Sequence, residues 1–331
     1  MIDFIGLILI TEILYNNKAD TRIDTFLKTQ FPNYSRTKIQ KLIVNSSFKV
    51  DSYVVKPSYK LKGTKVITYD DSYENESIEQ SKVIAQNISL DIIYEDDGLI
   101  VINKPAGLIV HPGAGNPDGT LLNGLIYHYK NNLSEIDNSR PGIIHRLDKE
   151  TSGVILIAKT NQMHYNISKQ FADRKIKKKY KAIVWGYPDK YENKIEGYLS
   201  RNKKNRLAFE LSKRKGKYSS STFKLVNKYT LPFSLLKVFP ITGRTHQIRV
   251  HLSSVGLPII NDDLYSGGLK RLKSYDSSVR LEMKKALSKI NRVALHAESI
   301  TFYHPIKEKN LTFNTKLPKD FLNFIESCCE K

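Results

Sequence analysis

IHRLDKETSG, residues 144–153, places the carboxylate of Asp148 in a turn between two apolar segments of the chain. Arg146 and Lys149 lie close to this carboxylate in sequence, and cationic neighbours keep a carboxyl group ionised. An ionised carboxylate can act as a nucleophile or as a general base. The serine and glycine that end the stretch are typical of a tight turn that exposes the acid at a strand end. A turn aspartate that only caps its own backbone fits the spacing equally well.

Four further motifs accompany this stretch along the chain. They are VINKPAGLIVHPG at 101–113, KKYKAIVWG at 178–186, TGRTHQIRVHL at 242–252, and LHA at 295–297 with FYHP at 302–305. Together with residues 144–153 they resemble, in order, the signature segments of the RluA family of pseudouridine synthases. The resemblance covers roughly residues 85–320. The N-terminal part is similar to an S4 RNA-binding domain, an arrangement typical of the RluD-like branch of that family.

The resemblance implies an α+β protein with two domains, which the length of 331 residues also favours. A small S4 domain of the αL type is expected first, followed by a catalytic domain with a mixed, mainly antiparallel β-sheet and flanking helices. We place the S4-like domain with its N-terminal strand in residues 1–75, a linker in 76–88 and the catalytic domain in 89–331. The stretch 70–86 is acidic and polar, which favours a linker there.

The apolar pattern of residues 19–70 predicts a small α/β unit. Ile23, Phe26 and Leu27 share a helical face, and Ser35 is a candidate N-cap for a second helix. Four basic residues of this unit are assigned to RNA binding: Arg22, Arg36, Lys38 and Lys41. Basic side chains are also common on solvated helices that bind nothing, and the resemblance to S4 domains is what favours RNA.

The chain is strongly basic. Lysine and arginine outnumber aspartate and glutamate by 53 to 33, which gives a formal net charge of +20. A charge of this size attracts polyanions, among them nucleic acid and anionic membrane surfaces. A basic tail is not the source, because the basic residues are spread along the chain.

Cysteine usage and the N-terminal sequence suggest a cytoplasmic protein. Cys328 and Cys329 are adjacent, so they cannot staple the fold, and the chain has no CxxC pair for zinc. This usage fits a reducing cytosol. The apolar run 4–10 is much shorter than the roughly 20 residues of a membrane span, so we expect an opening strand there and no membrane partner. The run lacks a preceding basic segment, which disfavours a signal peptide.

The resemblance implies isomerase chemistry. Pseudouridine formation breaks the N1–C1′ bond of a uridine, turns the uracil and rejoins it through C5. Because no redox step occurs, no cofactor is expected, and the chain shows neither a G-x-G-x-x-G motif opening a βαβ unit nor a Walker A motif. The family's essential carboxylate falls on Asp148. Whether this carboxylate attacks the sugar, attacks the base or removes a proton from C2′ stays open.

Two further catalytic residues are implied by the same motifs. Arg249 is expected to pair with Asp148, because a guanidinium holds a carboxylate at two points and keeps its pKa low. A phosphate contact is the alternative for this arginine. Tyr180 is expected to stack on the flipped uracil, and its hydroxyl to help remove the C5 proton. Without the motif, a tyrosine on a strand is more often part of a core or an interface.

Five residues are assigned to substrate binding. Arg146 is expected to fill the space that the flipped uridine leaves, since a flat guanidinium stacks well on bases. Arg244 is expected to contact a phosphate, and Ile248 to form an apolar floor beneath the base. His145 is included although its main expected role is to orient the turn, and Lys104 comes from the first motif.

No metal site is expected. His246 and His251 lie in a stretch that we interpret as a strand, in which residues at odd separations point to opposite faces. One segment departs from the family pattern: PIINDD, residues 258–263, stands where a glycine usually precedes the acid. Asn261 can replace glycine at positive φ, and either of the two following aspartates is then the equivalent acid. Residues 263–292 form a basic insertion that is either a surface loop and helix or an RNA-facing arm.

The expected partner is RNA, and large-subunit ribosomal RNA in particular, because an S4 domain favours a structured ribosomal substrate. The expected state is a monomer. A tRNA-directed enzyme of the same family is the alternative. A non-catalytic rRNA-binding protein is less favoured, because Asp148, Tyr180 and Arg249 occur together.

Overall fold

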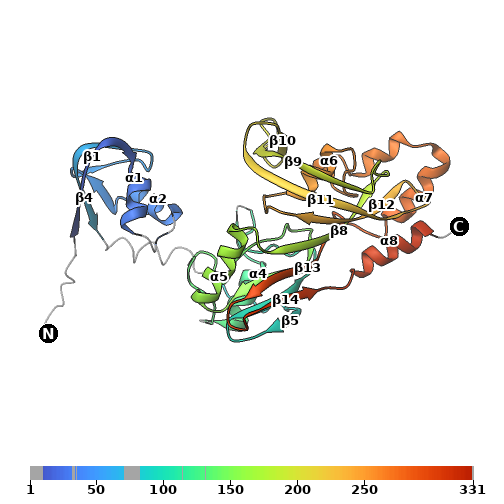
Figure 1. Ribbon diagram of the computed structural model, residues 1–331, viewed down its shortest axis with the longest axis horizontal. Helices are drawn as coiled ribbons and strands as arrows, with labels where there is room; N and C mark the ends of the chain where they lie inside the picture. The colour runs from blue at the N-terminus through green and yellow to red at the C-terminus, as the bar shows by residue number, and fades with distance from the viewer. Residues whose placement is uncertain are drawn as a thin grey trace. The chain divides into compact units, whose positions relative to one another are not determined.

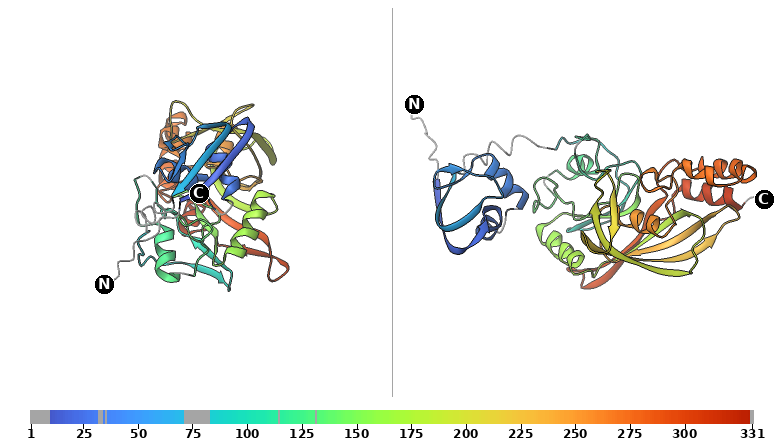
Figure 2. Two further views of the ribbon diagram at one scale, coloured as in Figure 1. Left: turned by 90° about the vertical axis from the view of Figure 1, so that its left-hand side faces the viewer. Right: turned by 90° about the horizontal axis from the view of Figure 1, so that it is seen from above.

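A computed structural model describes residues 10–31, 34, 36–70, 83–113, 115–130 and 132–329 (Figures 1 and 2). The chain forms two compact units, one in the residues up to Val83 and one that contains most of the residues from Ile84 onward. Within the described residues, no helix has the length and apolar character needed to cross a membrane.

The first unit combines a four-stranded antiparallel sheet with two helices. Its strand order is β1-β4-β2-β3. The elements are β1 (Ile10–Arg22), α1 (Ile23–Gln30), α2 (Arg36–Val44), β2 (Phe48–Val50), β3 (Tyr53–Val54) and β4 (Lys60–Asp70). Both predicted helices are confirmed, and Ile23 and Leu27 lie in the core that the helices share with the sheet. Ser35 and residues 4–9 of the expected opening strand lie outside the described residues.

The second unit is organised around a ten-stranded mixed sheet. Its strand order is β10-β9-β11-β12-β8-β13-β7-β6-β5, and β14 pairs with β13. The strands are β5 (Ile92–Glu95), β6 (Leu99–Lys104), β7 (Ser152–Ala158), β8 (Lys177–Trp185), β9 (Glu192–Arg201), β10 (Phe209–Ser212), β11 (Lys217–Lys228), β12 (Phe233–Pro240), β13 (Leu295–His304) and β14 (Lys309–Asn314). β13 and β7 pair in parallel, whereas the other described strand pairs of this sheet are antiparallel.

Helices accompany this sheet (Figure 1). They are α4 (Leu121–Tyr129), α5 (Asn161–Ala172), α6 (Gln247–Ser254), α7 (Ser277–Leu287) and α8 (Lys319–Cys329), with short 3-10 helices η1 (Asp263–Tyr265) and η2 (Leu269–Ser274). At the start of α5, the Thr160 hydroxyl oxygen accepts a hydrogen bond from the Met163 N–H at 3.2 Å, which satisfies a donor that the helix itself leaves unpaired. The α+β class with a mixed, mainly antiparallel sheet is thus confirmed.

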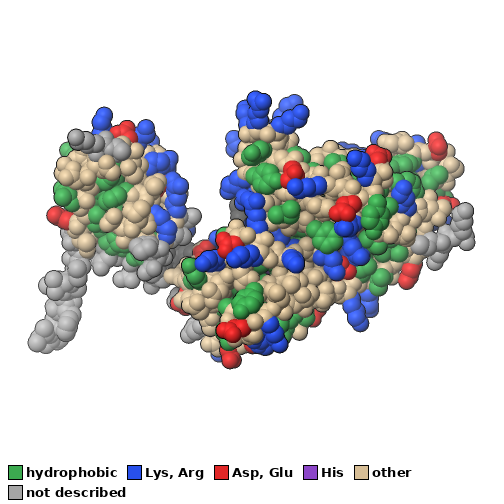
Figure 3. Space-filling view, in the orientation of Figure 1, with side chains coloured by type: hydrophobic (Ala, Val, Ile, Leu, Met, Phe, Trp, Pro, Cys, Tyr) green, Lys and Arg blue, Asp and Glu red, His purple; other side chains and the backbone are tan. Residues whose placement is uncertain are grey.

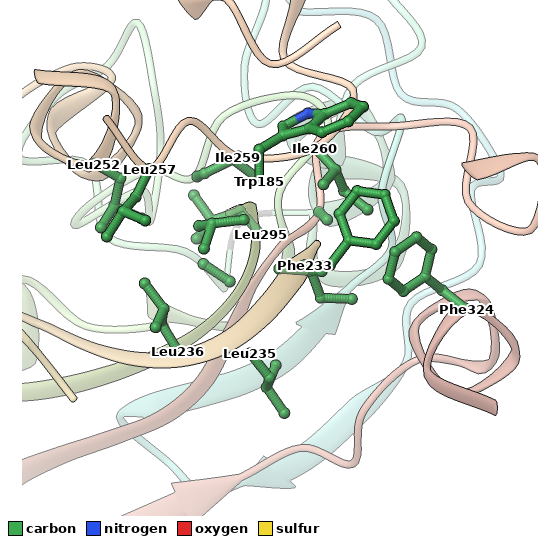
Figure 4. Close-up of a cluster of buried hydrophobic side chains, with 14 of the residues drawn as sticks. Trp185, Phe233, Leu235, Leu236, Leu252, Leu257, Ile259, Ile260, Leu295 and Phe324 are labelled. Atoms are coloured by element: carbon green, nitrogen blue, oxygen red, sulfur yellow. The ribbon is translucent and has the colours of Figure 1, made fainter. Parts of the chain in front are cut away.

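The largest core of the second unit fixes strand β8 (Figure 4). Trp185, at the end of β8, is fully buried, and its ring centroid lies 5.0 Å from that of Phe233 on β12. The indole N–H donates to the Gly267 carbonyl oxygen at 2.7 Å, so the polar atom of this buried ring is satisfied. Phe324 of α8 packs on Phe233 at 5.2 Å. This packing anchors the strand that also carries Tyr180.

Residues 263–292 are packed onto the same core. They contain η1, η2 and α7, and Met283, Ala286 and Leu287 of α7 are buried in the cluster that also holds residues of α8. The insertion therefore has the loop-and-helix form of the first interpretation, and contact of its exposed basic residues with RNA stays a prediction.

Candidate active site

The turn that carries Asp148 is held on both sides by backbone hydrogen bonds. The Thr151 N–H donates to the Asp148 carbonyl oxygen at 3.1 Å, and the Gly107 N–H of the first motif donates to the Lys149 carbonyl oxygen at 2.9 Å. The Asp148 side chain keeps 22% of its surface exposed. The turn is therefore fixed while the carboxylate remains accessible, as a reacting group requires.

Gly153 allows the close approach of β7 and β13. This glycine lies opposite Ala297 in the parallel pair and has a φ of +113°. A Cβ at this position would lie 2.1 Å from the Ala297 carbonyl oxygen, so a side chain is excluded by both contact and conformation. The preceding Ser152 hydroxyl contacts His296 Nδ1 at 2.9 Å. The serine and glycine of the motif thus begin β7 and do not form the turn itself, which corrects the expectation from sequence.

Arg249 joins two carboxylates. Its Nε and Nη2 donate to the two carboxylate oxygens of Asp262 at 2.7 and 2.9 Å, and its Nη1 donates to Asp148 Oδ2 at 3.3 Å. The expected pairing with Asp148 is present, but the two-point contact belongs to Asp262, whose side chain is fully buried. Burial alone would lower the pKa of Arg249, and the two carboxylates instead raise it above its ordinary value. The guanidinium therefore stays charged beside Asp148.

Asp262 is positioned by the turn that departs from the family pattern. Asn261 adopts a φ of +59°, so asparagine occupies the left-handed conformation that a glycine would otherwise supply. Asp262 binds Arg249, whereas Asp263 begins η1. The structure thus identifies Asp262 as the acid of this motif.

A cavity of about 140 Å³ opens at Asp148. Residues from the Asp148 turn, β8, the turn after β12 and α6 line it: Arg146, Leu147, Asp148, Thr151, Lys178, Tyr180, Pro240, Thr242, Gly243, Arg244, Thr245, His246, Gln247, Ile248, Arg249 and Leu295. Segments more than a hundred positions apart in the sequence thus converge on one carboxylate. The cavity combines an apolar wall with cationic and hydroxyl groups, which suits a flat polar ligand.

Tyr180 and Ile248 line this cavity together with Asp148. Ile248 is 5% exposed and also belongs to the main core, so it gives the cavity an apolar surface, and its contact with a base stays a prediction. Burial raises the pKa of the Tyr180 hydroxyl, and the nearby charge of Asp148 raises it further. The phenol therefore stays protonated at neutral pH.

The turn of residues 242–244 is clamped by one glutamine. Gln247 Oε1 accepts hydrogen bonds from the Thr242 hydroxyl at 2.6 Å and from the Arg244 N–H at 3.0 Å, and Gln247 Nε2 donates to the Ser220 carbonyl oxygen at 3.0 Å. Both Arg244 and Arg146 are exposed at the rim of the cavity. The Arg244 Nε donates to the Tyr218 carbonyl oxygen at 3.2 Å, and the exposed parts of both guanidinium groups are accessible to an anionic ligand.

The expected strand around Arg249 is wrong, because residues 247–254 form helix α6. His251 is fully buried, its Nε2 lies 2.8 Å from the Ser219 hydroxyl, and burial lowers its pKa to about 4. His246 Nδ1 lies 2.9 Å from the Tyr265 hydroxyl. The two histidines thus serve different hydrogen bonds on different parts of the helix.

His145 orients the turn and does not line the cavity. Its Nε2 accepts a hydrogen bond from the Leu156 N–H at 3.0 Å, and its ring packs on Phe171 at 4.8 Å. Burial, with a contribution from the charge of Lys178, lowers the pKa of His145 to about 3, so the ring remains neutral and can accept. These contacts agree with the structural role expected for His145, and nothing in the cavity lining supports a direct contact with the substrate.

Lys104 does not line this cavity either. It is fully buried, and its ammonium donates to the carbonyl oxygens of Pro105, Leu108 and Lys149 at 2.7, 2.8 and 3.2 Å. Burial lowers its pKa to about 7. All three protons of the ammonium are used, so this lysine ties the first motif to the Asp148 turn.

We expect Lys104→Met to destabilise the protein by about 2 kcal/mol, because three carbonyl oxygens would lose a shared donor that is itself fully buried. Urea unfolding measures this difference. Lys149→Met is the matched control, since the Lys149 side chain is exposed and only its backbone serves the turn. Equal stability of the two variants would contradict the structural role of the Lys104 ammonium.

Lys178 is a cavity residue that the sequence reasoning missed. Its ammonium donates to the Thr242 carbonyl oxygen at 2.9 Å, and burial lowers its pKa to about 8. A signal was available, because positions two apart on a strand share a face and Lys178 precedes Tyr180 by two.

The basic residues assigned in the first unit have different environments. Arg22 and Arg36 both hold the carboxylate of Asp24, at 2.9 and 3.0 Å, and Asp24 is fully buried. The Arg22 hydrogen bond is the main reason that the pKa of Asp24 lies far below its usual range. The two guanidinium groups remain about half exposed, at 44% and 53%, and Lys41 is exposed. The Lys38 side chain lies outside the described residues.

Family models match both units of the chain. The model for RNA pseudouridylate synthase matches residues 98–254, and the S4 domain model matches residues 21–67. A protein of Aquifex aeolicus named as an uncharacterized RNA pseudouridine synthase is 40% identical over 306 residues, which are 91% of this chain and 92% of that protein. The ribosomal large subunit pseudouridine synthase D of Zymomonas mobilis is 35% identical over 90% of this chain and 91% of that protein.

A solved structure of a pseudouridylate synthase is also similar to most of this chain. The human RNA pseudouridylate synthase domain containing 4 is 26% identical and covers 72% of this chain and 92% of its own, with a TM-score of 0.57. Three observations agree. The relatives are similar in sequence over most of both chains, the motifs occur in family order, and their side chains converge on Asp148. The chain belongs to the RNA pseudouridylate synthase family and is an RNA pseudouridine synthase with an S4 domain.

Proposed function

We propose that this enzyme isomerises uridine in a loop of large-subunit ribosomal RNA, that Asp148 is its catalytic carboxylate, and that it works in the cytoplasm. The assignment of the substrate rests on the similarity to ribosomal large subunit pseudouridine synthase D, which extends over 90% of the chain. A loop suits this chemistry, because a base that is already unpaired leaves its stack at low cost.

The reaction balances within the uridine itself. The N1–C1′ bond breaks, a C5–C1′ bond forms, and the proton on C5 is replaced by one on N1. Asp148 is the group proposed to act on the nucleotide, because its carboxylate is accessible and the charge of Arg249 lies 3.3 Å away. Since Asp262 holds Arg249 at two points, the arginine orients Asp148 without enclosing it.

Tyr180 is proposed to stack on the uracil. Its ring lines the cavity on β8, and aromatic rings stack on any base. The other expected role is removal of the C5 proton. The raised pKa of the Tyr180 hydroxyl disfavours this role, because the phenol stays protonated at neutral pH and cannot act as a base.

Basic side chains beside the cavity support an RNA substrate (Figure 3). The loops on either side of β10 carry exposed lysines and arginines: Lys203, Lys204, Arg206, Lys213, Arg214 and Lys215. β10 is adjacent to the site, because Phe209 packs on His246 at 5.8 Å. Phosphates on either side of a flipped nucleotide can therefore be neutralised by Arg146, Arg244 and these loops.

We expect the affinity for a ribosomal RNA stem-loop to fall steeply with salt. If about six phosphates are neutralised, the association constant drops roughly a thousandfold between 50 and 200 mM salt. Replacing Lys203 and Lys204 by glutamine should lower the slope of log K against log salt by about 1.4–1.8, since each lost phosphate contact contributes about 0.7–0.9. An unchanged slope would show that the β9–β10 loop does not touch the RNA. Glutamine in place of Lys307, an exposed lysine beyond β13, is the control.

Tritium release from C5-labelled uridine tests the substrate. Release from large-subunit ribosomal RNA transcripts and none from tRNA is expected. Mapping of pseudouridine in the ribosomal RNA of cells that lack the enzyme then locates the modified position. Release only from tRNA would refute the ribosomal substrate and leave the isomerase activity intact.

The division into an S4-like domain in 1–75, a linker in 76–88 and a catalytic domain in 89–331 is also a proposal. Removal of residues 1–80 is expected to weaken RNA affinity about tenfold while the catalytic domain stays folded, because each unit has its own apolar core. Filter binding and thermal unfolding measure the two effects. Loss of cooperative unfolding would place the boundary elsewhere, and unchanged affinity would exclude an S4 contact with this RNA.

A further inference from the structure

His246 lies in the active-site cavity in a backbone conformation that residues with side chains seldom adopt. It has a φ of +55° and a ψ of +17°, immediately before α6, and its carbonyl oxygen accepts the Val250 N–H at 2.9 Å. Histidine tolerates this left-handed region better than most residues, and such conformations gather at functional sites. The imidazole of His246 is therefore a candidate functional group.

The ring of His246 is held between two aromatic side chains. The ring centroids of Phe209 and Tyr265 lie 5.8 and 5.7 Å from it, and both rings stand nearly perpendicular to it, at 81° and 80°. Tyr265 is 7% exposed and also lies beneath the guanidinium of Arg249 at 5.0 Å. The imidazole is therefore fixed in orientation next to the Asp148–Arg249 pair.

The hydrogen bonds of Tyr265 define which nitrogen of His246 carries the proton. The Tyr265 hydroxyl oxygen accepts the Phe209 N–H at 2.9 Å and lies 2.9 Å from His246 Nδ1. A phenol has one proton to donate, and among the described residues the imidazole is the acceptor recorded at this hydroxyl. The arrangement that gives this buried phenol proton an acceptor points it at Nδ1, and we assign the ring proton to Nε2 on that ground.

Nε2 is the nitrogen left for a ligand. Within the part of the chain that the structure describes, hydrogen bonding of this ring is recorded only at Nδ1, and His246 lines the cavity at Asp148. Burial lowers the pKa of His246, against the opposing effect of Asp148, so the ring is neutral at neutral pH. A neutral, oriented N–H donor is thus available to whatever occupies the cavity.

We propose that His246 contacts the substrate, and that its Nε2–H donates a hydrogen bond to a carbonyl oxygen of the flipped uracil. When the N1–C1′ bond breaks, its electron pair leaves negative charge on the base, and the carbonyl oxygens share that charge. A fixed donor stabilises this state more than the intact nucleotide, without transferring its proton. Cytosine has an amino group in place of one of these carbonyls, so the contact can also contribute to the choice of uridine.

Two substitutions of His246 separate the donor from the backbone. Asparagine suits the left-handed conformation, but its amide reaches only to the place of Nδ1. Glutamine suits that conformation less well, yet its amide nitrogen can reach the place of Nε2. In single-turnover tritium release, we expect His246→Asn to lower the rate about a hundredfold or more, as for the loss of one transition-state donor, with RNA affinity unchanged. His246→Gln should lose less than about fivefold, because it keeps a donor.

Three results would overturn the proposal. One is wild-type rates in His246→Asn, and another is equal losses in the two folded variants. The third is a pH limb of the wild-type rate that disappears in His246→Gln, which would indicate proton transfer by the imidazole. The donor proposed here exists in both the neutral and the protonated ring, so it predicts the same pH profile for both enzymes.

Target uridines with sulfur in place of the oxygen at C2 or at C4 identify the accepting oxygen. A thiocarbonyl is a weaker acceptor than a carbonyl. Sulfur at the contacted position should therefore slow the wild type but add little to the loss in His246→Asn. Equal sensitivity of both enzymes at both positions would exclude the contact. The inference rests on the proposed function. The activity of the wild type distinguishes failure of the substrate assignment from failure of the His246 proposal. If only tRNA is modified, the ribosomal assignment fails, and the His246 variants are then tested on that tRNA.

Discussion

Asp148→Asn is expected to abolish pseudouridine formation while RNA binding persists. The amide matches the carboxylate in volume but can act neither as a nucleophile nor as a general base at neutral pH. The site should keep its shape, because Arg249 remains bound at two points to Asp262. We expect a rate at least about a hundredfold below wild type, since removal of an essential nucleophile has effects of this order or larger. Tritium release under single-turnover conditions measures the rate, and filter binding measures the affinity.

Glu150→Gln is the matched control, because Glu150 lies two positions from Asp148 in the same turn and does not line the cavity. It removes the same charge and should keep activity within a few-fold of wild type. A residual rate in Asp148→Asn above about one hundredth of wild type would reject Asp148 as the essential carboxylate. Similar losses in both variants would attribute the effect to the charge of the turn.

The sequence indicated the members of this site better than it indicated their contacts. Asp148, Tyr180 and Arg249 stand in short motifs with particular residue types, and the structure brings them to one cavity. The two-point contact between Arg249 and Asp262 depends on how α6 meets the turn before η1, and thirteen positions separate the two residues. Local spacing carries no information on such a contact, so sequence could offer two adjacent aspartates but not choose between them.

Helix α6 shows why a correct apolar pattern led to the wrong element. Ile248, Val250 and Leu252 alternate with polar residues, which is the period of a strand. In the structure Ile248 and Leu252 enter the main core, whereas Val250 enters a separate cluster with Leu199 and other residues near β10. The helix is buried on two sides, and two buried sides of an eight-residue helix give the same alternation as one face of a strand.

Lys104 was included with the substrate-binding residues as part of the first motif, and His145 was included although its main expected role was to orient the turn. Both form hydrogen bonds with the backbone around the Asp148 turn, since Lys104 binds three carbonyl oxygens and His145 accepts one N–H. A buried polar group is stable only when it is hydrogen-bonded, and sequence does not report burial. Their place in the motifs is therefore explained by the need to hold the Asp148 turn.

Asp262→Ala should destabilise the protein and inactivate it, through a residue that does not line the cavity. The substitution leaves the charge of Arg249 largely buried with Asp148 as its remaining carboxylate partner, at 3.3 Å. Breaking a buried pair on one side costs about 3–5 kcal/mol, so we expect a loss near the lower end of that range. The freed guanidinium should turn toward Asp148 and cover the carboxylate that the substrate needs. Urea unfolding and single-turnover tritium release measure the two effects.

The double variant Asp262→Ala with Arg249→Met distinguishes this mechanism from a simple loss of packing. It removes both charges of the buried pair, and replacement of a buried ion pair by apolar groups is often neutral for stability. We therefore expect the stability of the double variant to return to within about 1 kcal/mol of wild type, since coupled partners give non-additive effects. Activity should stay low, because Asp148 has lost the cation that orients it. A double variant no more stable than Asp262→Ala would mean that the single substitution destabilises the protein through the empty space that alanine leaves. Recovery of activity would show that Arg249 is dispensable for catalysis.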